Sequence, residues 1–378
     1  MPERLIIPSP EPLPLPADPI LLQGLLLLTF VLHILFMSQV LGGSLLYLGA
    51  TVAGGRKSGH PLQRLAHTLA GLFPWTVAFT ITTGVAPLLF VQLLYGSFFY
   101  SSSVLMAWPW FAVVPMLIVG YYALYWVSLK GKDRPAWARL TVGGLAAVVF
   151  LAIGFLYSTN LSLMQRPEVW AGVYAANPYG TSLVTEAALA PRFLHAVLGA
   201  VALASVLVLV HGAASAGSDA AYGRAVTRFG LASFVPAALL QAVVAPWYAS
   251  HLVPAVRDHL FDLGSLLGQL TVAALVVSAL AFVLLVAARG RLRYTGAGAA
   301  LVVAGQALLL IVRHMARNQA LAGYMPEGLW RVVPQTALVV LFLALLVVGL
   351  ATVGYMALRV RRDRVALAEV AAERRVAG

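Results

Sequence analysis

The chain of 378 residues is 61% hydrophobic and only 10% charged, which excludes an ordinary soluble domain, since such domains are nearer half apolar and a quarter charged. Its formal net charge of +12 does not indicate a nucleic-acid-binding protein, because the basic residues lie between apolar runs and near the C-terminus. The chain has no cysteine, so disulfides, iron–sulfur clusters, thiolate zinc sites and covalent c-type haem attachment are excluded. Any cofactor is expected to be held non-covalently by His or Met.

The predicted elements begin with a proline-rich lead-in at residues 1–19, which we interpret as outer and extended, not as a signal peptide. Apolar runs long enough to cross a bilayer follow. They are expected at 20–52, 65–95, 107–129, 140–160, 190–211, 228–250, 260–287, 296–320 and 332–358. The sequence therefore predicts an all-α, polytopic membrane helical bundle of about nine spans, with the membrane domain at 20–358 and a basic tail at 359–378.

The basic residues predict the orientation of these spans. Most of the 25 Lys and Arg lie in alternate loops and in the C-terminal tail. Cytoplasmic loops are enriched in Lys and Arg, so the N-terminus is expected outside and the C-terminus in the cytoplasm. All of the 13 Asp and Glu fall in loops, helix ends or termini. Because proton pumps and cation-coupled transporters generally keep an intramembrane acid, the pattern does not favour those classes.

Three histidines, His33, His195 and His314, lie within predicted spans toward the outer face. An imidazole at membrane depth must be hydrogen-bonded or coordinated, and neutral imidazole is the usual axial ligand of b-type haem. The sequence leaves two alternatives open, which are haem iron ligation and plain interhelical hydrogen bonding.

Arginines accompany two of these histidines. Arg192 lies one turn before His195, and Arg313 and Arg317 flank His314. Guanidinium groups are suited to pair with haem propionates, so these arginines are candidate propionate clamps. Gly199, one turn after His195, is expected to leave clearance for a flat macrocycle.

The remaining histidines lie at helix ends and in loops. His67 and His211 lie on the expected cytoplasmic side, where they are candidates for a second site or, alternatively, for helix capping and headgroup contact. His60 is expected to be a loop residue. His251 and His259 flank the short outer loop between the sixth and seventh spans.

Several stretches resemble subunit I of the cytochrome bd family of quinol oxidases. VLHILFMSQVLGGSLLYLGATVAGG (31–55) is similar to its first helix, and ALAPRFLHAVLGAVALASVLVLVHG (188–212) to its fifth. The resemblance implies that His33 and His195 bind haem. LLIVRHMARNQAL (309–321) falls where the family has a glutamate ligand and a Gly-Arg-Gln stretch, so His314 would replace the glutamate and Arg317 would keep the arginine.

The chain also departs from the family pattern. The long quinol-binding loop of the family is reduced here to SHLVPAVRDHLFD, and its acids in the third helix have no counterpart. A methionine ligand in the seventh helix is absent, and His259 or His251 are the candidate replacements. The sequence therefore does not favour oxygen reductase activity, although the scaffold is retained.

The function expected from these features is a membrane electron-transfer subunit with two or three b-type haems, or a variant haem, near the outer face. Electrons would pass between a quinol and an outer-face cytochrome c partner, or one of these alone. The resemblance implies a second homologous membrane subunit and a bacterial or archaeal inner membrane, where the bilayer is a further partner; no nucleic acid is expected. The alternatives are a divergent bd-type oxygen reductase and a haem-free transporter or scaffold.

Overall fold

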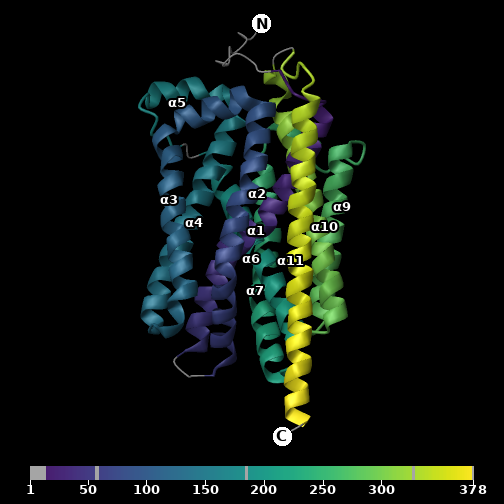
Figure 1. The fold of residues 1–378 in the computed structure, drawn as a ribbon. Helices are drawn as coiled ribbons and strands as arrows, with labels where there is room; N and C mark the ends of the chain where they lie inside the picture. Colours follow the sequence, from purple (N-terminus) through teal and green to yellow (C-terminus); the bar gives the residue numbers. More distant parts are fainter. Residues whose placement is uncertain (1–13, 56–58, 184–185, 326–327, 377–378) are drawn as a thin grey trace. The chain divides into compact units, whose positions relative to one another are not determined.

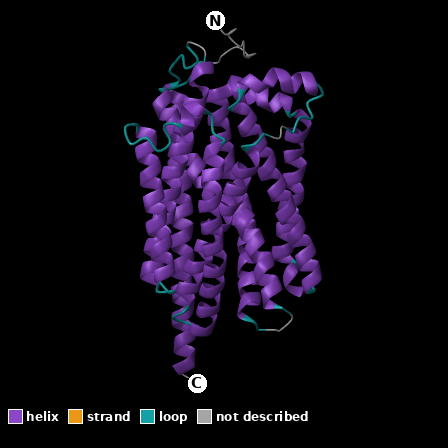
Figure 2. Cartoon of the chain, turned by 180° about the vertical axis from the view of Figure 1, so that it is seen from behind, coloured by secondary structure: helices purple, strands orange, loops and turns teal. Residues whose placement is uncertain are grey.

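A computed structural model of the protein describes residues 14–55, 59–183, 186–325 and 328–376. Nearly all of these residues are helical, and they form no strand beyond one isolated bridge (Figure 2). Among the described residues, nine helices are long and apolar enough to cross a membrane, which confirms the predicted polytopic helical class. Most of the proline-rich lead-in, residues 1–13, lies outside the described residues.

The nine helices follow the predicted spans in order. They are α1 (Pro19–Gly54), α2 (Pro61–Leu105), α3 (Ala107–Leu129), α4 (Ala136–Met164), α6 (Leu189–Ser215), α7 (Ala220–Ser250), α9 (Leu266–Ala287), α10 (Leu292–Leu321) and α11 (Thr336–Val376). The connections contain the short helices α5 (Trp170–Ala176) and α8 (Pro254–Arg257) and the 3-10 turns η1 (Gly131–Asp133), η2 (Pro167–Val169) and η3 (Ala322–Tyr324).

The chain divides into two compact units. The first contains Gln23–Glu327 and therefore all the candidate site residues. The second joins Leu13–Leu22 to Gly328–Gly378. Within the second unit, Leu15 donates its backbone N–H to the Arg331 carbonyl at 2.8 Å and accepts from Val333 N–H at 3.0 Å.

Two predicted boundaries need correction. The span expected to end at residue 95 continues as helix to Leu105, because the backbone departs from helical geometry only at Tyr95 (φ −132°, ψ 30°) and then resumes. The last helix also extends past the expected end of its span at residue 358, since α11 runs unbroken through the basic tail to Val376. Charged side chains beyond the bilayer are compatible with the helix, so composition alone did not mark a break.

Glycines allow the helices of the first unit to approach closely. In this unit α3 packs along α4, α6 along α7 and α9 along α10 (Figure 1). A Cβ atom on Gly42 of α1 would overlap the Ala200 carbonyl oxygen of α6. A Cβ atom on Gly143 of α4 would lie 2.8 Å from the Tyr47 ring. Small residues at such crossings are typical of membrane helix packing.

The crossing of α1 and α6 gives a stability prediction. Replacing Gly42 by alanine is expected to destabilise the protein by about 1–3 kcal/mol, because the added methyl group meets backbone that must move. The matched control is Gly24→Ala, since nothing lies within 4 Å of a Cβ atom at that position of the same helix. Thermal unfolding in detergent should show a lower midpoint for the Gly42 variant alone; equal midpoints would contradict the close crossing.

Candidate functional site

His33 on α1 is held by the neighbouring helix α2. Its Nδ1 lies 3.0 Å from the Thr80 carbonyl oxygen, which can only accept a hydrogen bond, so Nδ1 carries the proton and donates. The lone pair is then on Nε2, which is the arrangement found for metal-ligating histidines. A Cβ atom at Gly84 would lie 2.8 Å from Cε1 of this ring. Glycine at that position therefore makes room for the imidazole.

His195 on α6 contacts Gln241 on α7. The Gln241 Nε2 atom is 3.4 Å from His195 Nε2, a long contact. His195 Nδ1 is buried and has no hydrogen-bond partner, a state that costs free energy unless a further group satisfies it. The clearance predicted above Gly199 is taken by the Gln241 side chain, whose Nε2 would lie 2.9 Å from a Cβ atom there.

His314 on α10 lies in a hydrogen-bonded cluster. Arg317 Nη2 is 2.6 Å from His314 Nδ1, and Gln23 Oε1 is 2.7 Å from His314 Nε2. A guanidinium can only donate, so Nδ1 accepts and Nε2–H donates to the Gln23 oxygen. The Asn318 amide also donates to Gln23 Oε1, and Tyr95 donates its hydroxyl to Asn318 Oδ1. As a ligand, His314 would have to exchange one of these hydrogen bonds for a metal.

Arg317 and Arg313 extend the cluster along α10. Arg317 is only 6% exposed, stacks 4.2 Å from the centre of the Tyr95 ring, and has a buried Nε with no hydrogen-bond partner. The Arg313 guanidinium lies 4.9 Å from the centre of the Phe30 ring. Phe30 in turn stacks on His33 at 6.3 Å between ring centres. Side chains of α1 and α10 thus link the two histidine sites.

Arg192 joins α6 to two other helices. Its Nε donates to the Tyr248 hydroxyl of α7 at 3.0 Å, and Nη1 donates to Ser162 Oγ of α4 at 2.7 Å. No ion pair between a carboxylate and Arg192, Arg313 or Arg317 occurs in the part of the chain that the structure describes. Three cations within the membrane region without an acidic partner form a site suited to an anionic ligand.

The three histidines occupy different depths on one side of the crossing between α1 and α6. His33 precedes Gly42 by nine residues and His195 precedes Ala200 by five, which correspond to about 14 Å and about 8 Å along their helices. His314 contacts Gln23, which precedes His33 by about 15 Å on α1. The three histidines therefore lie toward one end of the unit but at separate levels.

The two histidines that flank the loop between α7 and α9, His251 and His259, are exposed. His251 Nδ1 lies 2.9 Å from the Trp247 carbonyl, and His259 Nδ1 lies 3.1 Å from the Ala255 carbonyl. Because a carbonyl oxygen only accepts, Nδ1 of each ring carries the proton and the lone pair is on Nε2. The hypothesis that one of them replaces a methionine ligand remains a prediction.

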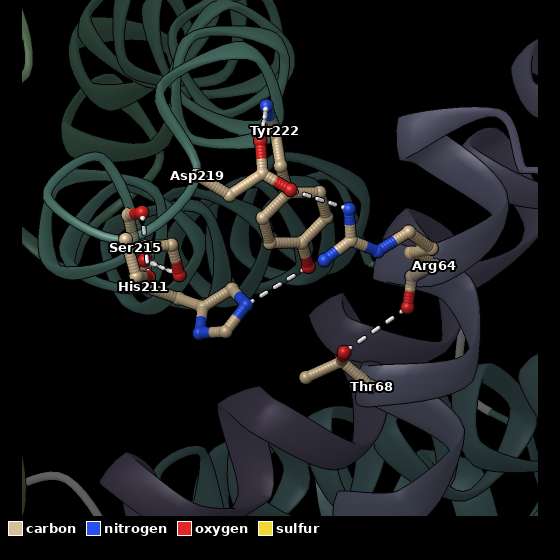
Figure 3. A pocket seen from close by; sticks show the side chains of 7 residues that line it. Arg64, Thr68, His211, Ser215, Asp219 and Tyr222 are labelled. Carbon is tan, nitrogen blue, oxygen red and sulfur yellow. Dashed lines mark hydrogen bonds and ion pairs between the residues drawn. The ribbon is translucent and has the colours of Figure 1, made fainter. Parts of the chain in front are cut away.

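The histidines at the opposite membrane end have other roles. His60 caps α2, where its side chain accepts from Leu62 N–H. His67 lies 3.5 Å from Arg139. His211 lines a pocket of about 250 Å³ with Arg64, Asp219 and Tyr222 (Figure 3), and its Nε2 is 2.9 Å from the Tyr222 hydroxyl. His67 and His211 thus have separate partners, and their use in a joint second site remains a prediction.

Asp219 in this pocket gives a pH-dependent prediction. Its ion pair with Arg64 at 2.7 Å, and the hydrogen bond from Tyr222 N–H, lower the pKa of Asp219 below its ordinary 3.8. A carboxyl with a lowered pKa stabilises the fold above its unfolded pKa and loses that contribution as pH falls through the folded pKa. The wild type should therefore unfold at a slightly higher temperature than Asp219→Asn near neutral pH; this difference should begin to shrink below about pH 4 and be lost once the pH is below the lowered folded pKa. A difference that persists in acid would contradict the ion pair; the effect is small because both side chains are exposed.

Sequence reasoning missed the polar residues that contact the candidate histidines and arginines. These are Gln23, Thr80, Tyr95, Ser162, Gln241, Tyr248 and Asn318. The available signal was polarity, because an amide or a hydroxyl inside a membrane span requires a hydrogen-bond partner. Which histidine or arginine each one contacts depends on helix rotation, which the sequence does not specify.

Comparison with known proteins supports the scaffold. No protein-family model and no curated protein sequence matches the chain. Six chains of solved structures do match. One, from the structure of bd oxidase from Geobacillus thermodenitrificans, superimposes with a TM-score of 0.73 over 92% of this chain and 99% of that chain, at 15% sequence identity. The chain has a bd oxidase-like fold. At this identity the likeness concerns the fold of this bd-like membrane protein and not its activity.

Proposed function

We propose that this bd-like membrane protein is a haem-binding electron-transfer subunit. The observation that carries the proposal is a set of buried polar atoms lacking partners that a haem would provide. His195 Nδ1 and Arg317 Nε are both buried without a hydrogen bond. The Gln241 amide can only donate to His195 Nε2, so His195 Nδ1 carries the proton and, like Arg317 Nε, needs an acceptor such as a haem propionate. His195 Nε2 would bind iron in exchange for its long contact with Gln241. The donor set therefore fits b-type haem.

The chain's residues divide into ligands and clamps. His33, with its proton held on Nδ1 by Thr80, offers Nε2 as a ligand. His195 is the second ligand, and His314 the third once it exchanges a hydrogen bond. Arg192, Arg313 and Arg317 would neutralise propionates, and His259 or His251 would complete a ligand pair. A bound haem supplies a one-electron couple, while the protein supplies orientation and electrostatics.

The proposed partners follow from this assignment. A quinol, an outer-face cytochrome c, or both would exchange electrons with the haems, and a second homologous subunit would complete the complex. The levels of His195, His33 and His314 along the helices support two or three haems. A bacterial or archaeal inner membrane is the proposed location.

A reduced-minus-oxidised absorption spectrum of the purified protein tests the proposal. We expect Soret and α bands of b-type haem, and pyridine-haemochrome quantitation should give about two or three haems per polypeptide. A protein that is folded and monodisperse but lacks both bands would instead be the haem-free transporter or scaffold, with its histidines serving interhelical hydrogen bonds.

Oxygen reduction is the second candidate function, and the fold is the observation that favours it. The absence of Asp and Glu from the membrane-spanning segments of the sequence argues against it, because protons must reach a buried oxygen site. Oxygen uptake by the purified complex with a reduced quinol separates the two functions. We expect haem reduction without sustained oxygen consumption.

A further inference from the structure

A second pocket, of about 370 Å³, lies at the end of the first unit where α1 stops and α4 begins. It is far along the helices from the histidine sites and independent of the function proposed for them. Gln63 of α2 closes one side, and its amide donates to the Gly55 carbonyl. Arg134, Pro135, Trp137 and Arg139 from the start of α4 also line the pocket.

Arg139 is the most informative residue of the pocket. Its side chain is 7% exposed, and its buried Nε has no hydrogen-bond partner. Its Nη1 lies 3.5 Å from His67 Nε2, which is too long to replace a full hydrogen bond. No carboxylate of the described residues pairs with it. A buried guanidinium in this state is strongly disfavoured unless an anion accompanies it.

The start of α4 adds to the positive potential. The residue before the helix is Pro135, and no side chain caps the first turn. The first N–H groups of a helix lack intrahelical acceptors and carry the positive end of its dipole, and such ends bind phosphate. Arg134, exposed at the rim, provides a second guanidinium. The residues lining the pocket include no acid.

The surroundings indicate the kind of anion. Trp137 is 71% exposed, and tryptophans concentrate at the level of lipid headgroups. Pro135 and Ala136 offer apolar walls beside the cationic groups. A tetrahedral phosphate oxyanion fits the two guanidinium groups and the helix end, and the apolar walls suit the glycerol that carries it in a lipid. We propose that this pocket binds the phosphate of an anionic phospholipid.

Native mass spectrometry of the full-length protein, released from nanodiscs of phosphatidylcholine containing phosphatidylglycerol, tests this proposal. Arg139→Gln should weaken retention of phosphatidylglycerol about tenfold, because a charge-assisted hydrogen bond is lost. Arg134→Gln, at an exposed position on the rim of the pocket, should weaken it about threefold. The matched control is Arg224→Gln, an exposed arginine outside the pocket on the same predicted membrane side, and it should retain the lipid like the wild type.

Further arms identify the source of the phosphate. In nanodiscs of phosphatidylcholine alone, the wild type and Arg139→Gln should retain the same amount of lipid. Excess inorganic phosphate should not displace phosphatidylglycerol from the wild type. Displacement by inorganic phosphate would overturn the lipid assignment in favour of a free-phosphate site. Equal retention by the wild type and Arg134→Gln would overturn the pocket itself, even if Arg139→Gln failed to fold.

Discussion

Replacing His195 by alanine is expected to remove one b-type component from the reduced-minus-oxidised spectrum and to leave the others in place. The imidazole lies between α6 and α7, with Nδ1 buried and unpartnered. If His195 is a haem ligand as proposed, alanine leaves the iron without it, so the haem content should fall by about one equivalent per polypeptide. Pyridine-haemochrome quantitation and the spectrum measure the two effects together.

The matched control for this experiment is His60→Ala. His60 caps α2 at the opposite membrane end, so its loss should cost some helix stability but no haem. Rescue makes the assignment sharper: His195→Gly should regain the missing spectral component when imidazole is added, because the free ligand can occupy the vacated space. An unaltered spectrum in a folded His195→Ala protein would show that this histidine serves only the Gln241 contact.

The helical class was predictable from the sequence because it depends on length and apolar composition. A membrane span is identified by the number of consecutive apolar residues, and this number does not depend on which helices the span packs against. The extension of α2 beyond Tyr95 was not predictable, since the stretch that follows, YGSFFYSSS, carries the polar and aromatic composition of a loop. Packing of Phe98 against Trp170 and hydrogen bonding of Ser102 to Asn160 hold it helical instead.

Of the residues in the candidate site, only the histidines and arginines could be predicted from the sequence. Histidine and arginine inside apolar runs are conspicuous in any sequence, so His33, His195, His314 and their arginines could be named. The contact between His314 and Gln23 joins residues 291 positions apart, and no local pattern encodes it. Gly199 illustrates the same limit of sequence-based prediction. The sequence predicts that a residue without a side chain leaves room beside α6, but it does not specify that the Gln241 side chain fills that room.

Arg317 provides the second large expected effect, in the reduction potential of the haem that we propose it accompanies. A nearby positive charge stabilises the reduced form, which carries one more negative charge. Replacing Arg317 by methionine should therefore lower the potential of one spectral component by on the order of 60 mV, equivalent to about tenfold in the one-electron equilibrium. A redox titration followed at the α band measures this shift.

Two further variants separate the effect of the Arg317 charge on the reduction potential from the effect of its packing. Arg317→Lys keeps the charge and should retain most of the potential, although it loses the planar donor set that contacts His314. Arg224→Gln removes an exposed arginine at the opposite membrane end from the proposed haem ligands and should leave every potential unchanged.

Stability provides an independent readout of the same residue. With a propionate bound, loss of Arg317 leaves a buried carboxylate unpaired, so the methionine variant should be less stable than the wild type. Without such an anion, Arg317 is itself the uncompensated buried charge, and methionine should be neutral or stabilising. A more stable variant with all potentials unaltered would therefore contradict the propionate pairing, because the sign of the stability change reports whether the cation has an anionic partner.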